Sequence, residues 1–583
     1  MTTATATATV TQHRAEVRAV PLLPLLPLLP PPEGARRLRN AAAVRWALAL
    51  VLALACLAGA AHGQAPAATP APRTRLELPG GPSAQTVNVW PIAADSSVFV
   101  YLDHEHRRQG RADKHTFSSY DARLRPRWTT AVELPAGTEC LALAADGPTP
   151  YALCTTPSAP RTLLLLAFAP GSGAVQQLRY TVPVAVQPLA FEVRGPEAFV
   201  VAVAYRQQTV LRLPLRDSAT AQFLPTLSSP TTLVADATPA PGGLAVLTTE
   251  SVDETTRLVL RSFPTAGAVA GEVHVLQGVA PARLTSGRVA VSPTAPQLVL
   301  GTYATRTPQY AQGLFSTRLG AGGPPTDQPP PPVYYYDLPT LPHYYERFGP
   351  RRRLKAAARA RRRRARGLET QAHARLLLHR PLPLPDGGYA LVAEQYYPRY
   401  RSGDSWTSRL LRPGFYPGGQ PFAYGLPGAY GLPGIYGNYA PLNAWDRGLD
   451  GYVFTQALVC VFDSSARLRW QNTFVLNTLT RLELREHVAA TVLPDGAVGL
   501  VAPSDNGDRL RQTILRGSGS AAPPHDRPLR PAQPAAERLL DVRTTQVLPW
   551  YAGRVLYVGF QRVRRTGAAE REVFVLENVE WEP

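Results

Sequence analysis

The residues whose types point most directly to a binding chemistry form a single run of cations. The stretch "RRRLKAAARARRRRARG", from Arg351 to Gly367, holds ten basic side chains in seventeen residues, in a chain whose net charge is +19. Guanidinium groups bind phosphate and carboxylate oxygens, so this density predicts salt-dependent binding of polyanions. The candidate polyanion-binding residues are Arg351, Arg352, Arg353, Lys355, Arg359, Arg361, Arg362, Arg363, Arg364 and Arg366.

The same run is predicted to be helical. Alanine and arginine both favour helix, and Gly367 is a suitable residue to end one. The residues before this glycine would span roughly 24 Å as a helix. Like charges three or four residues apart cost about 0.2–0.5 kcal/mol each, so the helix alone is marginally stable without counter-ions. A solvated helix without a ligand is the alternative interpretation, and the sequence leaves both open.

Two other stretches hold metal-ligating residue types. In "DHEHRRQGRADKH", His104 and His106 would share one face of a strand, as a metal site requires. The charge density there is more typical of a solvated loop between strands. In "PSDNGDR" the later glutamate of a calcium loop is missing. The sequence also lacks GxxxxGK[ST], strand–GxGxxG–helix and HExxH motifs, so no metal, cofactor or catalytic residue is expected.

The cysteines suggest one covalent cross-link. Cys140 and Cys154 flank "LALAADGPTPYAL", which is typical of two strands joined by a turn at Asp146-Gly147. The midpoint of the two cysteines falls on the turn, so they can face each other across the hairpin. A disulfide and a pair of free buried thiols both fit this arrangement. Cys460 alternates like a buried residue of a strand and is predicted to be a small core hydrophobe.

The elements that position these residues are predicted to be strands. Sixty prolines and forty-five glycines argue against long helices and for short strands with turns. An apolar strand after a turn recurs eight times, and the first four intervals are 53, 48, 45 and 54 residues. The recurrences are centred on Val98, Tyr151, Phe199, Leu244, Leu298, Tyr389, Val498 and Leu556.

A repeat of this length with about four strands matches one blade of a β-propeller. The predicted fold is therefore all-β, a β-propeller-like domain over residues 79–583 with seven or eight four-stranded units. Seven would result if the first and last units shared a blade to close the ring. A pair of β-sandwiches is the alternative fold.

Two insertions lengthen the later intervals to 91 and 109 residues. The first, residues 320–371, contains the basic helical run. The second, residues 399–450, contains "YGLPGAYGLPGI", whose prolines and glycines prevent a regular helix or sheet ladder. It is predicted to be a loop rich in Tyr, Gly and Pro.

The N-terminal residues 1–63 are predicted to be an extension followed by a signal peptide. "ARRLRN" supplies a positive flank, "WALALVLALACLAGAA" (Trp46–Ala61) an apolar core, and "AHG" small residues before cleavage at Gln64. An uncleaved anchor is the alternative. Residues 64–78 would be a linker. Export predicts a periplasmic or outer-surface location and an oxidising environment for the cysteines.

Two segments resemble a known set of sequences. "GGYALVAEQYYPRY" (Gly387–Tyr400) and "GYVFTQALVCVFDSSARLRWQNTFVLN" (Gly451–Asn477) are similar to segments of uncharacterised secreted proteins of Bacteroidota. The resemblance implies an envelope location and propeller-like repeats, and it carries no known activity. In those relatives a helix rich in Lys and Glu precedes the YYP strand, where this chain has its arginine run.

The expected function is that of an exported, non-catalytic binding or scaffold protein of the cell envelope. Its expected partner is an envelope protein or glycan, or an anionic membrane surface, and not nucleic acid, which an exported protein does not meet. Two alternatives are a polyanion-binding protein acting through the arginine run and a glycan-active enzyme whose site comes from several blades. A central pocket gathering carboxylates or histidines from at least three units would favour the enzyme, and an apolar or plugged channel the scaffold.

Overall fold

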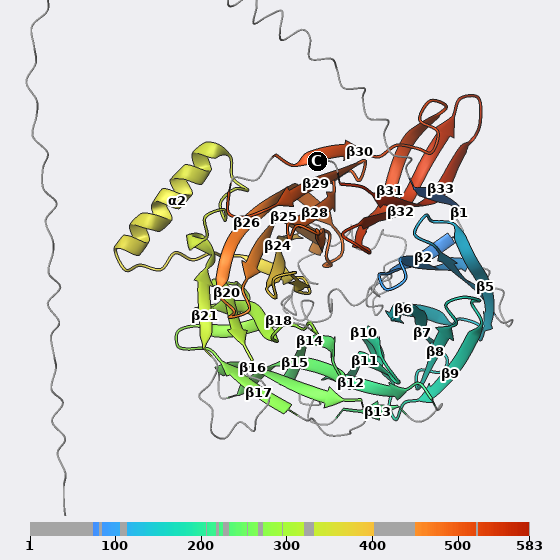
Figure 1. Cartoon of the computed structure of the whole chain (residues 1–583), viewed down its shortest axis with the longest axis horizontal. Helices are drawn as coiled ribbons and strands as arrows, with labels where there is room; N and C mark the ends of the chain where they lie inside the picture. Colours follow the sequence, from blue (N-terminus) through green and yellow to red (C-terminus); the bar gives the residue numbers. More distant parts are fainter. Residues whose placement is uncertain are drawn as a thin grey trace, which may run out of the picture. The chain divides into compact units, whose positions relative to one another are not determined.

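The computed structural model shows eight antiparallel sheets arranged in a ring, as drawn in Figure 1. The fold is an eight-bladed β-propeller, which confirms the predicted class and fixes the number of units at eight. All described residues belong to the compact unit Pro72–Pro583. They are residues 74–80, 84–104, 113–205, 207–216, 221–224, 232–252, 255–265, 272–293, 295–319, 332–400, 449–519 and 523–581.

Blades A to D follow one another along the chain, each with four strands. Blade A is β2 (Ala84–Ile92), β3 (Ser97–His104), β4 (Asp113–Tyr120) and β5 (Pro126–Leu134). Blade B is β6 (Glu139–Asp146), β7 (Thr149–Thr155), β8 (Thr162–Phe168) and β9 (Val175–Thr181). Blade C is β10 (Gln187–Arg194), β11 (Glu197–Ala204), β12 (Gln207–Pro214) and β13 (Gln222–Phe223). Blade D is β14 (Thr232–Ala240), β15 (Gly243–Val252), β16 (Thr255–Pro264) and β17 (Glu272–Gln277).

Blades E to H complete the ring. Blade E is β18 (Arg283–Ala290), β19 (Leu298–Ala304), β20 (Gly313–Arg318) and β21 (Val333–Asp337). Blade F is β22 (Arg375–Leu378), β23 (Leu382–Pro383), β24 (Tyr389–Tyr400), β25 (Leu449–Phe462) and β26 (Leu468–Arg481). Blade G is β27 (Ala489–Val492), β28 (Val498–Pro503), β29 (Arg509–Leu515) and β30 (His525–Pro528). Blade H is β31 (Glu537–Pro549), β32 (Val555–Arg565) and β33 (Glu570–Val579), joined by β1 (Arg75–Gly80) from the other end of the described chain.

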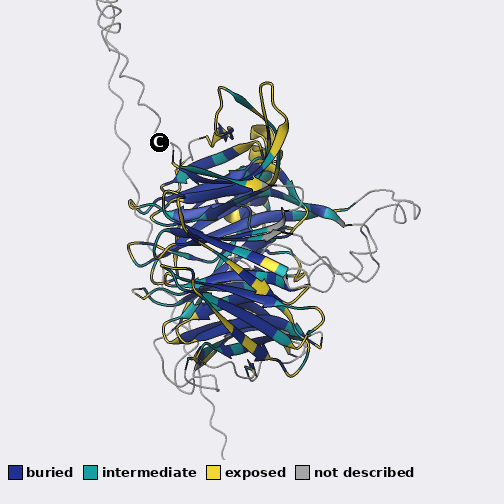
Figure 2. Cartoon of the chain, turned by 90° about the vertical axis from the view of Figure 1, so that its right-hand side faces the viewer, coloured by how far each residue is buried: buried dark blue, intermediate teal, exposed yellow. Residues whose placement is uncertain are grey.

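The recurring apolar strand of the sequence is, in each blade, the neighbour of the innermost strand in the sheet order, from β3 beside β2 in blade A to β32 beside β31 in blade H. These strands are buried on both faces because neighbouring blades pack against them, and β11, β19 and β28 are almost entirely buried. One apolar cluster extends across blades A, B and C, and another joins blade A to blade H. Figure 2 shows this buried interior running through the strands, with exposed residues concentrated at the turns.

The ring closes through β1, which pairs antiparallel with β33 and places Arg75 opposite Glu577. Residues 75–78 were expected in a linker, and the structure places them in this strand. The predicted extension and signal peptide, residues 1–63, lie outside the described residues. Within the described part of the chain, no helix is long and apolar enough to cross a membrane.

The insertions are shorter than the sequence suggested. β21 (Val333–Asp337) lies inside the predicted first insertion and forms the last strand of blade E. The rest contains a short 3-10 helix, η1 (Leu338–Thr340), and α2 (Pro350–Ala365), which carries the basic run. The second insertion begins after Tyr400, where β24 ends, and residues 401–448 lie outside the described residues.

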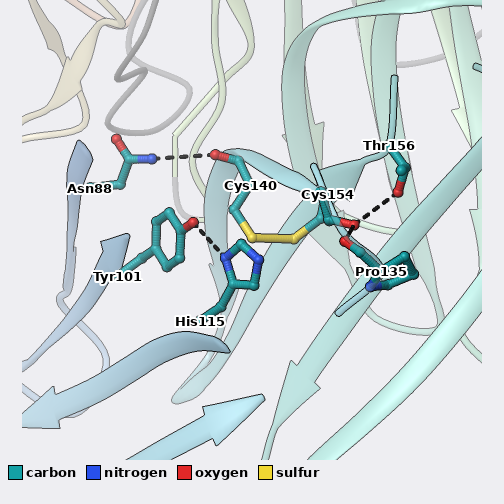
Figure 3. Close-up of a disulfide and its surroundings, with 8 residues drawn as sticks. Asn88, Tyr101, His115, Pro135, Cys140, Cys154 and Thr156 are labelled. Carbon is teal, nitrogen blue, oxygen red and sulfur yellow. Dashed lines mark hydrogen bonds between the residues drawn. A yellow bond between two sulfur atoms is a disulfide. The ribbon is translucent and has the colours of Figure 1, made fainter. Parts of the chain in front are cut away.

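Cys140 and Cys154 lie opposite each other on β6 and β7 and form a disulfide, with 4.0 Å between their Cα atoms (Figure 3). Both side chains are buried in the apolar cluster of blades A to C. Cys460 is also buried, and burial raises the pKa of its thiol to about 12, so it is unreactive near neutral pH.

Replacing Cys140 and Cys154 together by alanine is expected to lower the free energy of unfolding by about 2–3 kcal/mol. The reason is that the bridge closes a loop with a sequence separation of 14 residues and so restricts the unfolded chain. Urea denaturation of oxidised protein measures the change, with thiol counting to verify the bridge. Coincident denaturation curves for the variant and the wild type would contradict it.

Candidate functional site

Helix α2 owes its limits to the residues at its two ends. Pro350 occupies the first turn, where its missing N–H would have no helical acceptor. At the other end, Gly367 adopts a φ of +69°, which is accessible to glycine without strain. Its N–H donates to the Arg364 carbonyl, and the N–H of Leu368 donates to the Arg363 carbonyl. This Schellman arrangement ends the helix where the sequence predicted.

The cations of α2 face solvent. Nine of the ten are exposed, and the tenth, Arg363, is half-buried and donates from Nη2 to the Glu369 carbonyl at 2.8 Å. No carboxylate in the described part of the chain forms an ion pair with any of the ten, and the first turn contains no acidic residue. The positive charge of the helix is therefore uncompensated by the residues that the structure describes.

The segment before α2 is fixed to blade F by buried amide side chains. Gln471 Oε1 accepts from the His343 N–H at 3.1 Å, and Gln456 Nε2 donates to the Tyr344 carbonyl at 3.1 Å. Thr473 Oγ1 donates to the His343 carbonyl at 2.9 Å, and Arg347 donates to Gln395. Buried amides of this kind are stable only when hydrogen-bonded, so they specify where the segment docks.

These docking residues belong to the segments that carry the resemblance. Gln395 lies in "AEQYYP", Gln456 in "TQAL" and Gln471 in "WQNTF". The segment after the helix is held as well. Arg363, in the last turn of α2, donates a hydrogen bond to the Glu369 carbonyl, and the Glu369 side chain accepts one from Thr305 of blade E. Hydrogen bonds before and after α2 therefore fix its position on the ring. Ala360 is the buried residue of the helix.

A second group of charged residues lies on the inner strands of the ring and on the segments beside them. We call it the inner cluster, and it gathers side chains from blades C, D, E and F and from the segment leading into blade G. Its members are Glu192, Asp236, Arg288, His379, Arg380, Glu394, Glu486 and His487.

Ion pairs connect different blades within this cluster. Arg288 Nη1 lies 3.1 Å from Asp236 Oδ1, which joins blades E and D. Arg380 Nη2 lies 2.7 Å from Glu192 Oε1, which joins blade F to blade C across two intervening blades. The inner cluster thus connects parts of the ring that share no sheet.

Glu394 is the most deeply buried member. Its side chain has no exposed surface, and its Oε1 atom accepts from His379 Nε2 at 2.8 Å and from the backbone N–H groups of His487 and Val488. On the other side of the imidazole, His379 Nδ1 lies 3.7 Å from Glu486 Oε2. The imidazole therefore lies between two carboxylates.

Burial and neighbouring charges shift the acidities of these groups. Burial raises the pKa of Glu486 to about 7, although His379 and Arg288 oppose the shift. Burial also raises the pKa of Glu192 and lowers that of His487 well below its usual value. For His379, burial disfavours the charge, but the carboxylates of Glu486 and Glu394 outweigh it and raise its pKa.

The inner cluster gathers carboxylates and histidines from three blades, C, D and F, and from the segment leading into blade G, so it has the residue types expected of an enzyme site. Its charges, however, pair mainly with one another. The pocket beside it, lined by Glu192, Asp236, Arg288 and apolar residues of blades C and D, has room for about one water molecule. This arrangement can hold the blades together and bind protons.

The metal-like stretch gives no site among the described residues. His115 is buried in β4 and hydrogen-bonds the Tyr101 hydroxyl at 2.8 Å, while His104 belongs to β3 and His106 lies outside the described part. Among the described residues, no group of three or more His, Cys, Asp or Glu could hold a metal ion.

Sequence reasoning missed the inner cluster. A signal existed, because single charges interrupt apolar strands in "LAFEVR" (Glu192), "LVADATPA" (Asp236) and "YALVAEQYY" (Glu394). A charge within such a strand is stable only when paired, so each predicts a partner from another blade.

Known proteins resemble this chain only weakly. No family model matches the chain, and no curated protein matches it. Among solved structures, polysaccharide lyase Uly1 is 7% identical, with a TM-score of 0.34 over 76% of this chain and 90% of that one. A putative 6-phosphogluconolactonase from Bacteroides fragilis is 12% identical, with a TM-score of 0.33 over 76% and 94%. A prolyl endopeptidase is 12% identical, with a TM-score of 0.34 over 83% and 53%. At these identities and TM-scores the similarities support no conclusion about this chain.

Proposed function

We propose that this chain is an exported binding or scaffold protein of the cell envelope that attaches to polyanions through helix α2. The observation that carries the proposal is the set of ten cations on one exposed helix, none of them paired with a carboxylate of the described chain. The ligand chemistry is that of closely spaced phosphate or carboxylate groups, as on an anionic phospholipid surface or an acidic glycan.

The geometry of α2 supports a multivalent ligand. At 3.6 residues per turn, seven of its cations project within about 120° of one another. They are Arg351, Arg352, Lys355, Arg359, Arg362, Arg363 and Arg366. A basic side chain near an anionic surface contributes about 1 kcal/mol, so the stripe supplies several kcal/mol when its members act together. The same contacts relieve the repulsion between neighbouring cations.

The helix is unsuited to insertion into a bilayer. Its residues are basic or small apart from Leu354, which is exposed, so it lacks the apolar face of an interfacial helix. Binding would therefore be electrostatic and would weaken steeply with salt.

Replacing Arg351, Lys355, Arg359, Arg362 and Arg366 by glutamine is expected to weaken binding to anionic phospholipid vesicles at low salt at least tenfold, because the stripe loses five charges. Co-sedimentation measures this, with neutral phospholipid vesicles as the blank. A soluble polyuronate, used as competitor, separates the two ligand sources, since it displaces the protein only if the glycan-type anion also binds.

The matched control removes five exposed arginines elsewhere in the ring, Arg216, Arg283, Arg318, Arg530 and Arg565, by the same substitution. This control loses the same net charge but keeps every cation of α2, so its binding is expected to fall less than threefold. Equal binding by the helix variant and the wild type, to vesicles and to polyuronate alike, would refute the proposed function.

A further inference from the structure

The inner cluster has more carboxylates than guanidinium groups among its members. Four carboxylates, those of Glu192, Asp236, Glu394 and Glu486, share the site with two guanidinium groups, those of Arg288 and Arg380. Uncompensated charge is costly where water is largely excluded. Two protons are therefore needed for neutrality. His379, between two carboxylates, accommodates one, and a carboxylate must hold the other.

The hydrogen bonds indicate which carboxylate this is. Asp236 accepts from Arg288, from the Val289 N–H and from Thr238, so both of its oxygens are occupied. Glu394 Oε1 accepts three hydrogen bonds. Glu192 is paired with Arg380.

Glu486 differs from these three. Neither of its oxygens accepts a hydrogen bond from the described residues, and its Oε1 atom is buried. Glu394 also has one buried oxygen without a hydrogen bond, Oε2, but its other oxygen accepts three. The nearest cation is the imidazole of His379, at 3.7 Å. Protonation of Glu486 therefore costs the fewest interactions.

We propose that the inner cluster is a proton-binding site, in which Glu486 holds a proton beside His379 and so stabilises the junction of blades F and G below neutral pH. Loss of this proton leaves the junction with an uncompensated charge on a side chain that is only 15% exposed, and loosens it. This inference does not depend on the polyanion-binding function of α2.

Several elements of the ring contribute charged or titratable groups around Glu486. The segment after β22 contributes His379 and Arg380, β24 contributes Glu394, and β18 contributes Arg288. Behind the two arginines lie Asp236 of β14 and Glu192 of β10, and the segment of Glu486 itself carries Arg485 and His487. The surrounding cations limit the rise in the pKa of Glu486, and without them the pKa would be higher still.

The direction of the pH effect follows from the acidities in the two states. The pKa of Glu486 is about 7 in the folded protein against 4.5 when unfolded, so the folded state binds more protons between these values. Stability is therefore highest below pH 4.5 as far as Glu486 is concerned, and it falls as the pH rises towards 7. His379, whose pKa is raised, adds a loss of the same sign above pH 6.5. His487, whose pKa is lowered, acts in the opposite direction and only below pH 6.5.

The test is Glu486→Gln, which mimics the protonated carboxyl at every pH. Urea denaturation of the wild type and the variant is measured at pH 5 and at pH 8. The unfolding constant of the variant, relative to the wild type, is expected to be at least tenfold smaller at pH 8 than at pH 5, since each pKa unit corresponds to about a factor of ten. An equal ratio at the two pH values overturns the proposal.

Glu483→Gln is the matched control, because Glu483 lies three residues earlier, is half exposed and pairs with Arg485 at 3.4 Å. It should show the same ratio at both pH values. A second readout needs no variant of the site. Infrared spectroscopy of the wild type should show the carbonyl band of a buried, protonated carboxyl that disappears as the pH is raised through 7. Absence of such a band at pH 6 overturns the proposal even if the glutamine variant fails to fold.

Discussion

Replacing Arg75 by alanine is expected to lower the free energy of unfolding by about 3–5 kcal/mol, because it removes several buried charge-assisted hydrogen bonds at once. Glu577 then keeps one guanidinium partner, Arg527, in place of two. Arg75 is 7% exposed, and its Nη1 lies 3.2 Å from Glu577 Oε2, which is 3% exposed. The same guanidinium bonds Glu77, Gln561 and the Arg530 carbonyl. One side chain thus connects β1 to blades G and H at the point where the ring closes.

Arg571 supplies the matched control, since it also pairs with two carboxylates, those of Glu77 and Glu537, each at 2.8 Å. Its side chain is 43% exposed, so Arg571→Ala should cost no more than about 1 kcal/mol. Urea denaturation of the two variants gives the comparison. Equal destabilisation would show that the Arg75 contacts do not hold the ring closed.

The second large effect is expected at Asp236. Asp236→Ala removes the ion pair to Arg288, whose side chain is 3% exposed, and the acceptor for the Val289 N–H. We expect a loss of about 3–5 kcal/mol in the free energy of unfolding, because a buried guanidinium loses its carboxylate. Asp236→Asn keeps the shape and should restore part of the loss.

Asp526 offers the comparison for Asp236. It binds Arg511 through both oxygens, at 2.8 and 2.9 Å, and its side chain is 37% exposed. Asp526→Ala should therefore cost about 1 kcal/mol or less. If the two aspartates proved equally sensitive, the inner cluster would have no special part in holding blades D and E together.

The repeat was predictable because every blade imposes the same demand on the strand next to its innermost one. That strand packs against a neighbour on both faces, so it must be apolar throughout, and a turn must precede it. Leu244 and Tyr389 each lie two residues after a glycine, Gly242 and Gly387, which adopts positive φ in the turn before the strand. The pattern therefore survives in the sequence even though the blades share few identical residues.

Ring closure could not be predicted in the same way. β1 has only six residues, and its partner β33 lies at the opposite end of the chain. Nothing local distinguishes "RLELPG" from a linker with two leucines, since its role depends on Glu577 and Gln561 far away in sequence. The inner cluster was missed for a similar reason, because each blade contributes one to three of its members and the set exists only in the closed ring.

The basic helix was predictable in its secondary structure but not in its docking. Composition and Gly367 were sufficient to predict α2, whereas its attachment depends on Gln456 and Gln471 in strands a hundred residues later. Those strands hold the segment before the helix, and nine of the ten cations of the basic run are exposed, which is what the proposed function requires.

The dependence of polyanion binding on salt tests the proposed function most directly. The affinity for a soluble polyphosphate is measured over a range of salt concentrations for the wild type and for the variant with five glutamines in α2. If α2 is the binding surface, the slope of log affinity against log salt becomes shallower in the variant, by about 0.7 for each contact removed, and the control lacking five arginines elsewhere keeps the wild-type slope. Equal slopes for the wild type and the α2 variant would contradict the account.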